Sequence, residues 1–318
     1  MKIVILDGFT VVQEDLNWDA LKEFGELVYH ERTPKDQVIP RIIDAEMILT
    51  SKCIIDRNVI DSSPKLKYIG VIATGYNNVD IGHANKKGIT VTNIPAYSTE
   101  SVAQLSFALL LDVYNQVGLH NESVHRGDWE NNSDFSYTLS PQNEIAGKTM
   151  GIIGYGNIGK KVAAIARAFD MDVLINSSHM KSKDSTKEIE FVEFDELLAR
   201  SDIVSLHCKM TDDNKEMINK ESLSKMKDGS ILINTARGPL VDIDDLSDAL
   251  KKGKPRAAAL DVLPEEPPKP GSEITRLSNC IITPHIAWIT KEARQKLIDI
   301  AVNNVDTYLC GNPINTIK

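Results

Sequence analysis

The chain has 318 residues, enough for about two domains, and its composition is ordinary, with 42% hydrophobic and 25% charged residues. These values exclude a collagen-like chain, a disordered tail and a small disulfide-stapled scaffold. The 36 basic and 45 acidic residues give a net charge of −9, which argues against general binding to nucleic acid or to anionic membranes. An anionic ligand therefore has to meet a local cluster of hydrogen-bond donors.

The sequence predicts a cytoplasmic protein without a structural metal. The N-terminal apolar run, residues 3–6, is too short for a signal peptide, and residues 102–113 are too short and too polar to cross a bilayer. The cysteines are scattered and show no metal-binding spacing with each other or with histidine, so we expect free thiols in a reducing compartment. They are Cys53, Cys208, Cys280 and Cys310.

Short apolar runs alternate with helical patterns along the whole chain. Strands are predicted at residues 3–6, 47–49, 68–73, 90–92, 150–153, 173–175, 203–206, 231–234, 257–261 and 281–283. Helices are predicted at residues 15–24, 98–117, 159–169, 195–199, 243–251 and 290–308. Many of the strands are continuously apolar, as expected for strands covered on both faces. This βαβα order predicts the α/β class, with parallel, doubly wound sheets. The polar residues 127–144 predict a long surface connection.

A glycine-rich loop stands near the middle of the chain. It contains the pattern GxGxxG, which closes one predicted strand, opens a helix and is followed by a further strand, as a dinucleotide-binding loop requires. Gly154 would make the tight turn, Gly156 would let the backbone approach a pyrophosphate, and Gly159 would let the helix pack on the strand. The helix N-terminus would supply amide donors to the phosphates. The alternative is a glycine-rich turn without a ligand.

A nicotinamide cofactor implies hydride transfer, and a keto-acid substrate needs a cation for its carboxylate. Ligands of open α/β sheets bind beyond the carboxyl ends of the strands, so candidates are sought just after the strands. Arg237 follows the strand at residues 231–234, and its planar guanidinium could hold a carboxylate with two hydrogen bonds. From position alone, a solvated surface arginine is an equal alternative.

The reaction also needs an acid for the developing alkoxide. Two of the seven histidines, His207 and His285, come directly after an apolar strand. Imidazole titrates near neutrality and can give or take a proton at C2, although a structural role is the commoner explanation for a single histidine. Glu266 lies in a proline-rich loop. Against an imidazole it would fix the tautomer and stabilise the protonated form, but taken alone it is typical of a surface acid.

Five ordered motifs resemble the D-isomer-specific 2-hydroxyacid dehydrogenase family over nearly the whole chain. Besides the glycine loop, they are ATGYNNVD at residues 73–80 with NIPAYSTESVA at 93–103, NTARG at 234–238, LDVLPEEP at 260–267, and PHIAW at 284–288. The resemblance implies a Rossmann-type nucleotide lobe at residues 99–284. That lobe is inserted into a flavodoxin-like substrate lobe made of residues 1–98 and 285–318, and the active site lies in the cleft between the lobes.

The resemblance also implies roles for individual residues. Arg237 would clamp the substrate's carboxylate and carbonyl, His285 would be the acid/base, and Glu266 its partner carboxylate. The backbone amides of the loop at residues 73–75 would hold the substrate carboxylate, and Asp261 would contact the nicotinamide carboxamide. The implied substrate-binding residues are Ala73, Thr74, Gly75 and Arg237. The implied cofactor-binding residues are Thr99, Gly154, Gly156, Asn157, Ile158, Gly159, Ser177, Ser178 and Asp261.

The position that would meet the adenosine ribose departs from the NAD pattern. An NAD site usually places Asp or Glu about 20 residues past the glycine loop. Here the family pattern aligns Ser177 with that position, 18 residues after Gly159, and no carboxylate follows until Asp184. Without that carboxylate a 2′-phosphate is not repelled, so we expect use of NADPH, alone or alongside NADH. Donors for a phosphate follow the strand: Ser177, Ser178, His179, Lys181 and Lys183.

The activity implied is hydride transfer between NAD(H) or NADP(H) and a small D-2-hydroxyacid or 2-keto acid. The favoured substrates are D-glycerate and hydroxypyruvate, which are interconverted, or glyoxylate. D-lactate-type and phosphoglycerate dehydrogenases are alternatives within the enzymes, and a non-catalytic, nicotinamide-sensing corepressor is the alternative outside them. The resemblance implies a homodimer with the apolar helix at residues 102–113 in the interface. The alternative is that this helix is buried in its own core.

Overall fold

The computed structural model describes residues 1–180, 182–186 and 188–318. The chain divides into two units, Met1–Ser98 with Ile289–Lys318, and Thr99–Trp288. The chain thus returns to the first unit at Ile289, four residues after the expected boundary at residue 285. The reason is local: the His285 amide donates to the Asp261 carbonyl at 2.9 Å, which holds this segment to the end of the strand Ala257–Leu260.

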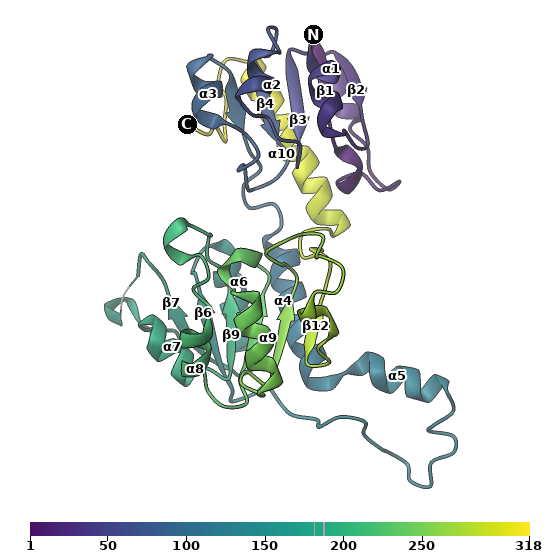
Figure 1. Ribbon diagram of the computed structural model, residues 1–318, viewed down its shortest axis with the longest axis vertical. Helices are drawn as coiled ribbons and strands as arrows, with labels where there is room; N and C mark the ends of the chain where they lie inside the picture. Colours follow the sequence, from purple (N-terminus) through teal and green to yellow (C-terminus); the bar gives the residue numbers. More distant parts are fainter. Residues whose placement is uncertain (181, 187) are drawn as a thin grey trace. The chain divides into compact units, whose positions relative to one another are not determined.

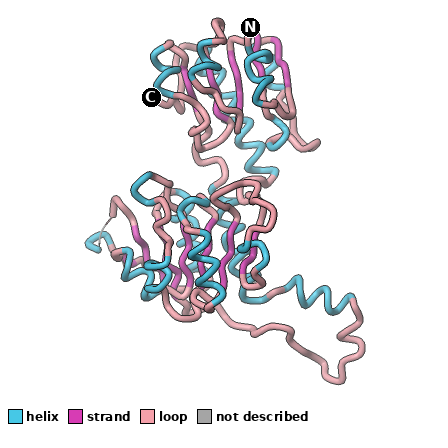
Figure 2. Tube along the Cα trace, viewed as in Figure 1, coloured by secondary structure: helices cyan, strands magenta, loops and turns pink. Residues whose placement is uncertain are grey.

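The first unit is a parallel five-stranded sheet in the order β2-β1-β3-β4-β5, the flavodoxin-like order. Helices lie on both faces of the sheet (Figures 1 and 2). Its strands are β1 Lys2–Ile5, β2 Glu26–Tyr29, β3 Met47–Thr50, β4 Tyr68–Val71 and β5 Thr90–Thr92. Its helices are α1 Val38–Ile42, α2 Arg57–Asp61, α3 Ile81–Lys86 and α10 Lys291–Leu309, with 3-10 turns at Gly8–Thr10, Asp19–Phe24 and Lys35–Gln37.

The C-terminal helix α10 is tied to the N-terminal part of its unit by a buried arginine. Arg294 is 5% exposed, and its guanidinium donates to both carboxylate oxygens of Asp15 at 2.7 Å and to the carbonyl of Val11 at 3.0 Å. The helix expected at residues 15–24 is instead a 3-10 helix, Asp19–Phe24, because the Asn17 side chain accepts the Asp19 amide and starts the turn there.

The second unit is a parallel seven-stranded sheet in the order β12-β11-β10-β9-β6-β7-β8. The chain order reverses between β6 and β9, as in a Rossmann sheet. The strands are β6 Thr149–Ile153, β7 Asp172–Asn176, β8 Glu190–Phe191, β9 Ile203–Leu206, β10 Ile231–Asn234, β11 Ala257–Leu260 and β12 Cys280–Ile282. The helices are α4 Thr99–Asn115, α5 Val117–His125, α6 Asn157–Ala168, α7 Phe194–Arg200, α8 Lys220–Lys225 and α9 Ile243–Lys251. The 3-10 turns are Ser182–Asp184, Asp212–Asn214, Gly238–Leu240 and Glu273–Arg276.

Each face of this sheet carries its own apolar core. Helices α4 and α6 pack on one face, and α7, α8 and α9 pack on the other. The helix expected at residues 98–117 ends early, because Gln116 adopts a left-handed conformation with φ 44° and separates α4 from α5. Strands β2 and β8 were not predicted, because β8 has only two residues and every residue of β2 is half-buried or exposed.

The predicted fold class, α/β with two doubly wound parallel sheets, is confirmed. Among the described residues, no helix combines the length and the apolar character that a membrane span requires.

Candidate active site

Three neighbouring strands of the second unit deliver the candidate catalytic side chains to one edge of the sheet. Strands β10, β11 and β12 are adjacent and parallel, so their carboxyl ends meet at the same edge. Arg237 comes after β10, Glu266 after β11 and His285 after β12. Strand order therefore places residues that are far apart in sequence at the same edge of the sheet.

His285 and Glu266 are joined by a direct hydrogen bond. The Nδ1 atom of His285 lies 2.6 Å from Oε2 of Glu266, and both side chains are about one-third exposed, at 32% and 34%. The other carboxylate oxygen, Oε1, accepts the backbone amide of Leu263 at 3.0 Å. With Nδ1 donating to the carboxylate, Nε2 is the nitrogen left to exchange a proton with a ligand.

The backbone of His285 is held in an uncommon conformation. Its φ of 56° lies in the left-handed region, which is unfavourable for a residue with a side chain unless the surroundings enforce it. The His285 amide donates to the carbonyls of Asp261 and Thr283, both at 2.9 Å. These two bonds fix the direction in which the imidazole leaves the chain.

Asp261 organises the same loop through its side chain. It is 1% exposed. Its Oδ1 accepts the Thr283 hydroxyl at 2.5 Å and the Ile286 amide at 2.9 Å, and its Oδ2 accepts the Ala287 amide at 2.8 Å. A carboxylate has about four acceptor positions, so these three bonds leave one. The sequence suggested a nicotinamide contact for Asp261 and did not suggest this clamp.

Arg237 is exposed and is presented by a tightly packed turn. A Cβ at the neighbouring Gly238 would lie 2.0 Å from the carbonyl group of Leu263, so only glycine lets this turn pack against the loop that carries Glu266. One Arg237 nitrogen donates to the Ala236 carbonyl at 2.7 Å. Within the described parts of the chain, the guanidinium has no carboxylate partner and keeps donors for a ligand.

The glycine loop fits the pyrophosphate of a dinucleotide. Gly154 has φ 98°, and a Cβ there would lie 2.5 Å from the Cys208 amide nitrogen. At Gly159 a Cβ would lie 2.1 Å from the Gly154 carbonyl oxygen, whereas at Gly156 it would meet open space. Gly156 caps α6 without a side-chain hydrogen bond, so the first amides of the helix, from Asn157, Ile158 and Gly159, remain available as donors.

The residues after β7 occupy the position at which a dinucleotide-binding fold contacts the adenosine ribose. Ser177 is half-buried and its hydroxyl oxygen accepts the His179 amide at 3.3 Å, while Ser178 and His179 are exposed. Lys183 lies in the 3-10 turn that follows. The remaining candidate donor, Lys181, lies outside the described residues.

Thr99 begins α4 at the same edge of the sheet. Near the start of α4, the Ser106 hydroxyl shares a 3.0 Å hydrogen bond with the hydroxyl of Thr235, just past β10. Near its end, the Arg256 guanidinium, just before β11, lies over the Tyr114 ring in a cation–π contact. Helix α4 therefore runs antiparallel to the strands, and its first turn projects beyond their carboxyl ends.

His207 also ends a strand at this edge, but it differs from His285. Its Nε2 shares a 2.8 Å hydrogen bond with the Ser205 hydroxyl, and its Nδ1 is fully buried and has no partner among the described residues. Burial lowers the pKa of His207 to about 4. The ring is therefore neutral at pH 7, which makes His207 a poor proton donor.

The loop after β4 in the first unit presents free amides. The Thr74 hydroxyl donates to the Ile94 carbonyl at 2.9 Å, and the Thr74 carbonyl accepts the Asn93 side chain at 2.8 Å. Against this fixed frame, the amides of Ala73, Thr74 and Gly75 donate to no acceptor in the described chain. Such a loop suits a carboxylate.

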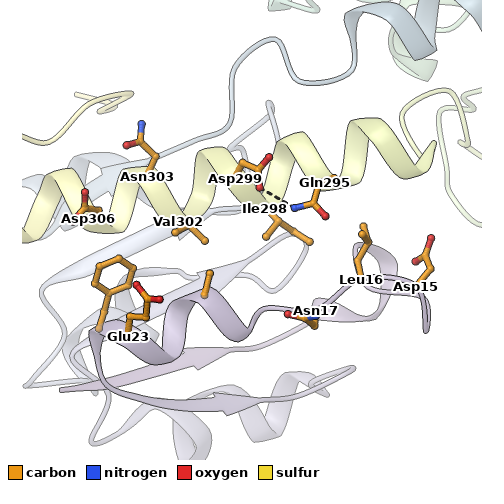
Figure 3. Close-up of a pocket in the computed structure, with 12 residues that line it drawn as sticks. Asp15, Leu16, Asn17, Glu23, Gln295, Ile298, Asp299, Val302, Asn303 and Asp306 are labelled. Carbon is orange, nitrogen blue, oxygen red and sulfur yellow. Dashed lines mark hydrogen bonds between the residues drawn. The ribbon is translucent and has the colours of Figure 1, made fainter.

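A groove elsewhere in the first unit is a poor site for an anion. It has a volume of about 700 Å³ and lies between residues 15–24 and α10 (Figure 3). Four carboxylates line it, from Asp15, Glu23, Asp299 and Asp306, and these would repel a keto acid. The described residues also contain no cluster of three or more His, Cys, Asp or Glu side chains able to hold a metal ion.

Comparison with known proteins identifies the family. A family model described as "D-isomer specific 2-hydroxyacid dehydrogenase, NAD binding domain" matches residues 107–287. The chain is 45% identical over 321 aligned residues to a hydroxypyruvate reductase of Blautia hydrogenotrophica, and the alignment covers 100% of each. The chain belongs to the D-isomer-specific 2-hydroxyacid dehydrogenase family.

Two solved structures resemble this dehydrogenase along its length. One is an acyclic imino acid reductase (Bsp5) in complex with NADPH and D-Arg, with 33% identity, a TM-score of 0.86 and full coverage of both chains. The other is the D-lactate dehydrogenase of Aquifex aeolicus complexed with NAD and lactic acid, with 32% identity, a TM-score of 0.81 and coverage of 98% and 96%. The dehydrogenase described here is an NAD(P)-dependent oxidoreductase acting on the CH–OH group of 2-hydroxyacids.

Proposed function

We propose that this dehydrogenase reduces hydroxypyruvate to D-glycerate, and glyoxylate to glycolate, with His285 as the acid. The hydrogen bond between His285 and Glu266 carries the catalytic part of the proposal, and the similarity to a hydroxypyruvate reductase supports the substrate. When bound, the reduced nicotinamide cofactor supplies the hydride that C2 of the keto acid accepts.

The proton in this reaction comes from the imidazole. Glu266 accepts a hydrogen bond from the Nδ1–H group of His285, so the protonated ring carries its second proton on Nε2. Nε2 gives this proton to the C2 oxygen of the keto acid as that oxygen becomes negative. The charge-assisted bond to Glu266 stabilises the imidazolium before the transfer. In the oxidative direction the neutral Nε2 takes the proton back.

Arg237 and the first unit's free amides bind the substrate in this proposal. The Arg237 guanidinium, which has no carboxylate partner in the described chain, stabilises negative charge on the carbonyl oxygen and holds the carboxylate. The amides of Ala73, Thr74 and Gly75 donate to the carboxylate. Asp261 holds the His285 loop and offers its remaining acceptor position to the nicotinamide carboxamide.

A panel of keto acids tests the proposed substrates. Hydroxypyruvate and glyoxylate should be reduced with a higher kcat/KM than pyruvate, measured from cofactor oxidation with NADH and NADPH in separate assays. A higher value for pyruvate would instead indicate a D-lactate dehydrogenase, and the absence of cofactor oxidation with every keto acid would refute the proposal.

The His285→Gln variant should lower kcat by roughly 10²–10⁴, the usual contribution of a general acid, without changing the dissociation constant of the cofactor. His125→Gln, which changes an exposed histidine of α5, is the matched control and should retain full activity. The measurements are steady-state kinetics and cofactor titration by calorimetry.

Turnover of the His285→Gln variant close to that of the unmodified enzyme between pH 6 and 8 would exclude His285 as the acid. In the same assays Arg237→Lys, which keeps the charge but loses the planar fork, should raise KM for the keto acid and lower kcat. If both constants stay unaltered, Arg237 has no part in the reaction.

We further propose that the enzyme uses NADPH, alone or alongside NADH. The support is the absence of a carboxylate at Ser177 together with the exposed donors that follow it. A carboxylate there would repel the 2′-phosphate of NADPH and accept a hydrogen bond from the ribose of NADH.

The Ser177→Asp variant should therefore shift the ratio of kcat/KM values toward NADH, measured for both cofactors at a fixed keto-acid concentration. Ser177→Ala separates the effect of charge from the loss of the hydroxyl and should leave the preference closer to that of the unmodified enzyme. A preference of the unmodified enzyme for NADH above roughly a hundredfold, about 2.7 kcal/mol, would contradict the proposal.

We also propose that the enzyme is a homodimer, but through a different segment from the one first expected. Most apolar residues of α4, including Phe107, Leu109 and Leu110, are buried within their own unit. Helix α5 and the loop after it instead extend away from the body of that unit (Figure 1). They expose six large apolar side chains, Val117, Leu119, Val124, Trp129, Phe135 and Leu139, and exposed apolar side chains concentrated on one projecting segment are typical of an interface.

Light scattering coupled to gel filtration should give twice the chain mass of 35.2 kDa at micromolar concentration. The double variant Trp129→Ser with Phe135→Ser should shift the mass toward that of one chain, since both side chains are exposed and the folded unit does not depend on them. A monomer mass for the unmodified protein would end this proposal.

A further inference from the structure

The loop after β3 in the first unit places a lysine beside the loop after β4. Thr50 and Val71 are paired in register at the ends of these neighbouring strands. Lys52 and Ala73 each follow two residues later, and adjacent strands lie about 4.8 Å apart. The backbone of Lys52 therefore leaves the sheet next to the loop that the proposed function assigns to the substrate carboxylate.

Hydrogen bonds join the two loops directly. The side-chain amide of Asn78 donates to the Cys53 carbonyl at 3.0 Å, and the Asn78 carbonyl accepts the Ile55 amide at 2.8 Å. The Ile55 carbonyl in turn accepts the Asp80 amide at 3.0 Å. The loops after β3 and β4 consequently form one fixed surface.

The backbone on either side of Lys52 is fixed by a carboxylate. Asp7 accepts the amide of Ser51 at 2.7 Å, that of Lys52 at 2.6 Å and that of Cys53 at 3.0 Å. The Lys52 side chain itself is exposed, and no ion pair in the described chain includes it. A fixed backbone thus starts an exposed lysine side chain, without an ion pair in the described chain, beside the loop of residues 73–75.

The proposed reaction leaves one part of a small keto acid for this ammonium group. The amides of residues 73–75 take the carboxylate, and the C2 oxygen receives the proton, so the substituent on C3 remains. We propose that Lys52 selects 2-keto acids carrying oxygen on C3, by donating a hydrogen bond from Nζ to that oxygen. This inference rests on the proposed function and deepens it.

Lys52 then accounts for discrimination among three similar substrates. A C3 hydroxyl accepts the bond from Nζ, whereas the methyl group of pyruvate desolvates the ammonium without a partner, and glyoxylate has no C3. A site that donates to a substrate oxygen rejects the analogue that lacks it more strongly than an apolar pocket would. A phosphate on the C3 oxygen would add a charge pair to the hydrogen bond.

The test compares Lys52→Met with the unmodified enzyme on hydroxypyruvate, 3-phosphohydroxypyruvate, pyruvate and glyoxylate. The substitution should lower kcat/KM for hydroxypyruvate about 10- to 100-fold, as expected for a lost hydrogen bond to a charged donor. The phosphorylated substrate separates hydroxyl recognition from charge recognition and should be affected at least as strongly. The value for glyoxylate should change less than about threefold, and that for pyruvate should rise, because methionine removes the ammonium group that the methyl group would desolvate.

Two further variants control for charge and for general damage. Lys52→Arg keeps the cation and should restore part of the activity on hydroxypyruvate. Lys86→Met removes an exposed lysine from the last position of α3. Because α3 leads to the amino end of β5, away from Lys52, this variant should change none of the four kcat/KM values.

The outcomes separate this inference from the proposed function. An equal loss with all four keto acids would mean that Lys52 binds the shared carboxylate, and no loss with any would place it outside the site. Either result overturns the inference while the enzyme remains active. If no keto acid is reduced, the inference about Lys52 is tested by calorimetric titration of D-glycerate and D-lactate into the protein with the oxidised cofactor present. The inference then requires a preference for D-glycerate that disappears in Lys52→Met.

Discussion

The buried carboxylate of Asp261 is the constraint on which the candidate active site depends. A carboxylate that is 1% exposed is costly to bury unless hydrogen bonds replace its water. Here all the donors come from one short loop, through the Thr283 hydroxyl and the amides of Ile286 and Ala287. Desolvation of one group therefore enforces the path of the loop, including the left-handed backbone of His285. The imidazole direction follows from that path.

Close backbone contacts then bring the neighbouring loops to this edge of the sheet. The turn at Gly238 touches the Leu263 carbonyl group, and the turn at Gly154 touches the backbone of Cys208. A side chain at either position would force these loops apart. The same absence of Cβ atoms leaves the first amides of α6 open at Gly156. Glycine thus serves packing at some of these positions and ligand approach at another.

The local arrangement of donors matters more than the net charge of the chain. In a protein with a net charge of −9, the free amides of residues 73–75 and Arg237 lie at the carboxyl ends of strands, whereas four carboxylates line the groove along α10. The carboxylate of Asp7 lies among the strand ends of the first unit, where it accepts hydrogen bonds from three backbone amides. It then fixes a loop, and the Lys52 ammonium group has no ion pair with the residues that the structure describes.

The sequence alone determined the α/β class, ten of the strands and the glycine loop, because continuous apolar runs and GxGxxG follow from local chemistry. It also indicated Arg237 and His285 as strand-end residues, and the family motifs added Glu266. It did not reveal β2, which has no buried residue, or β8, which has only two residues. Only the tertiary structure decided that Asp261 clamps the His285 loop, that His207 is buried and neutral, and that Lys52 stands beside Ala73. Each of these depends on strand order and register, which join residues that no local pattern connects.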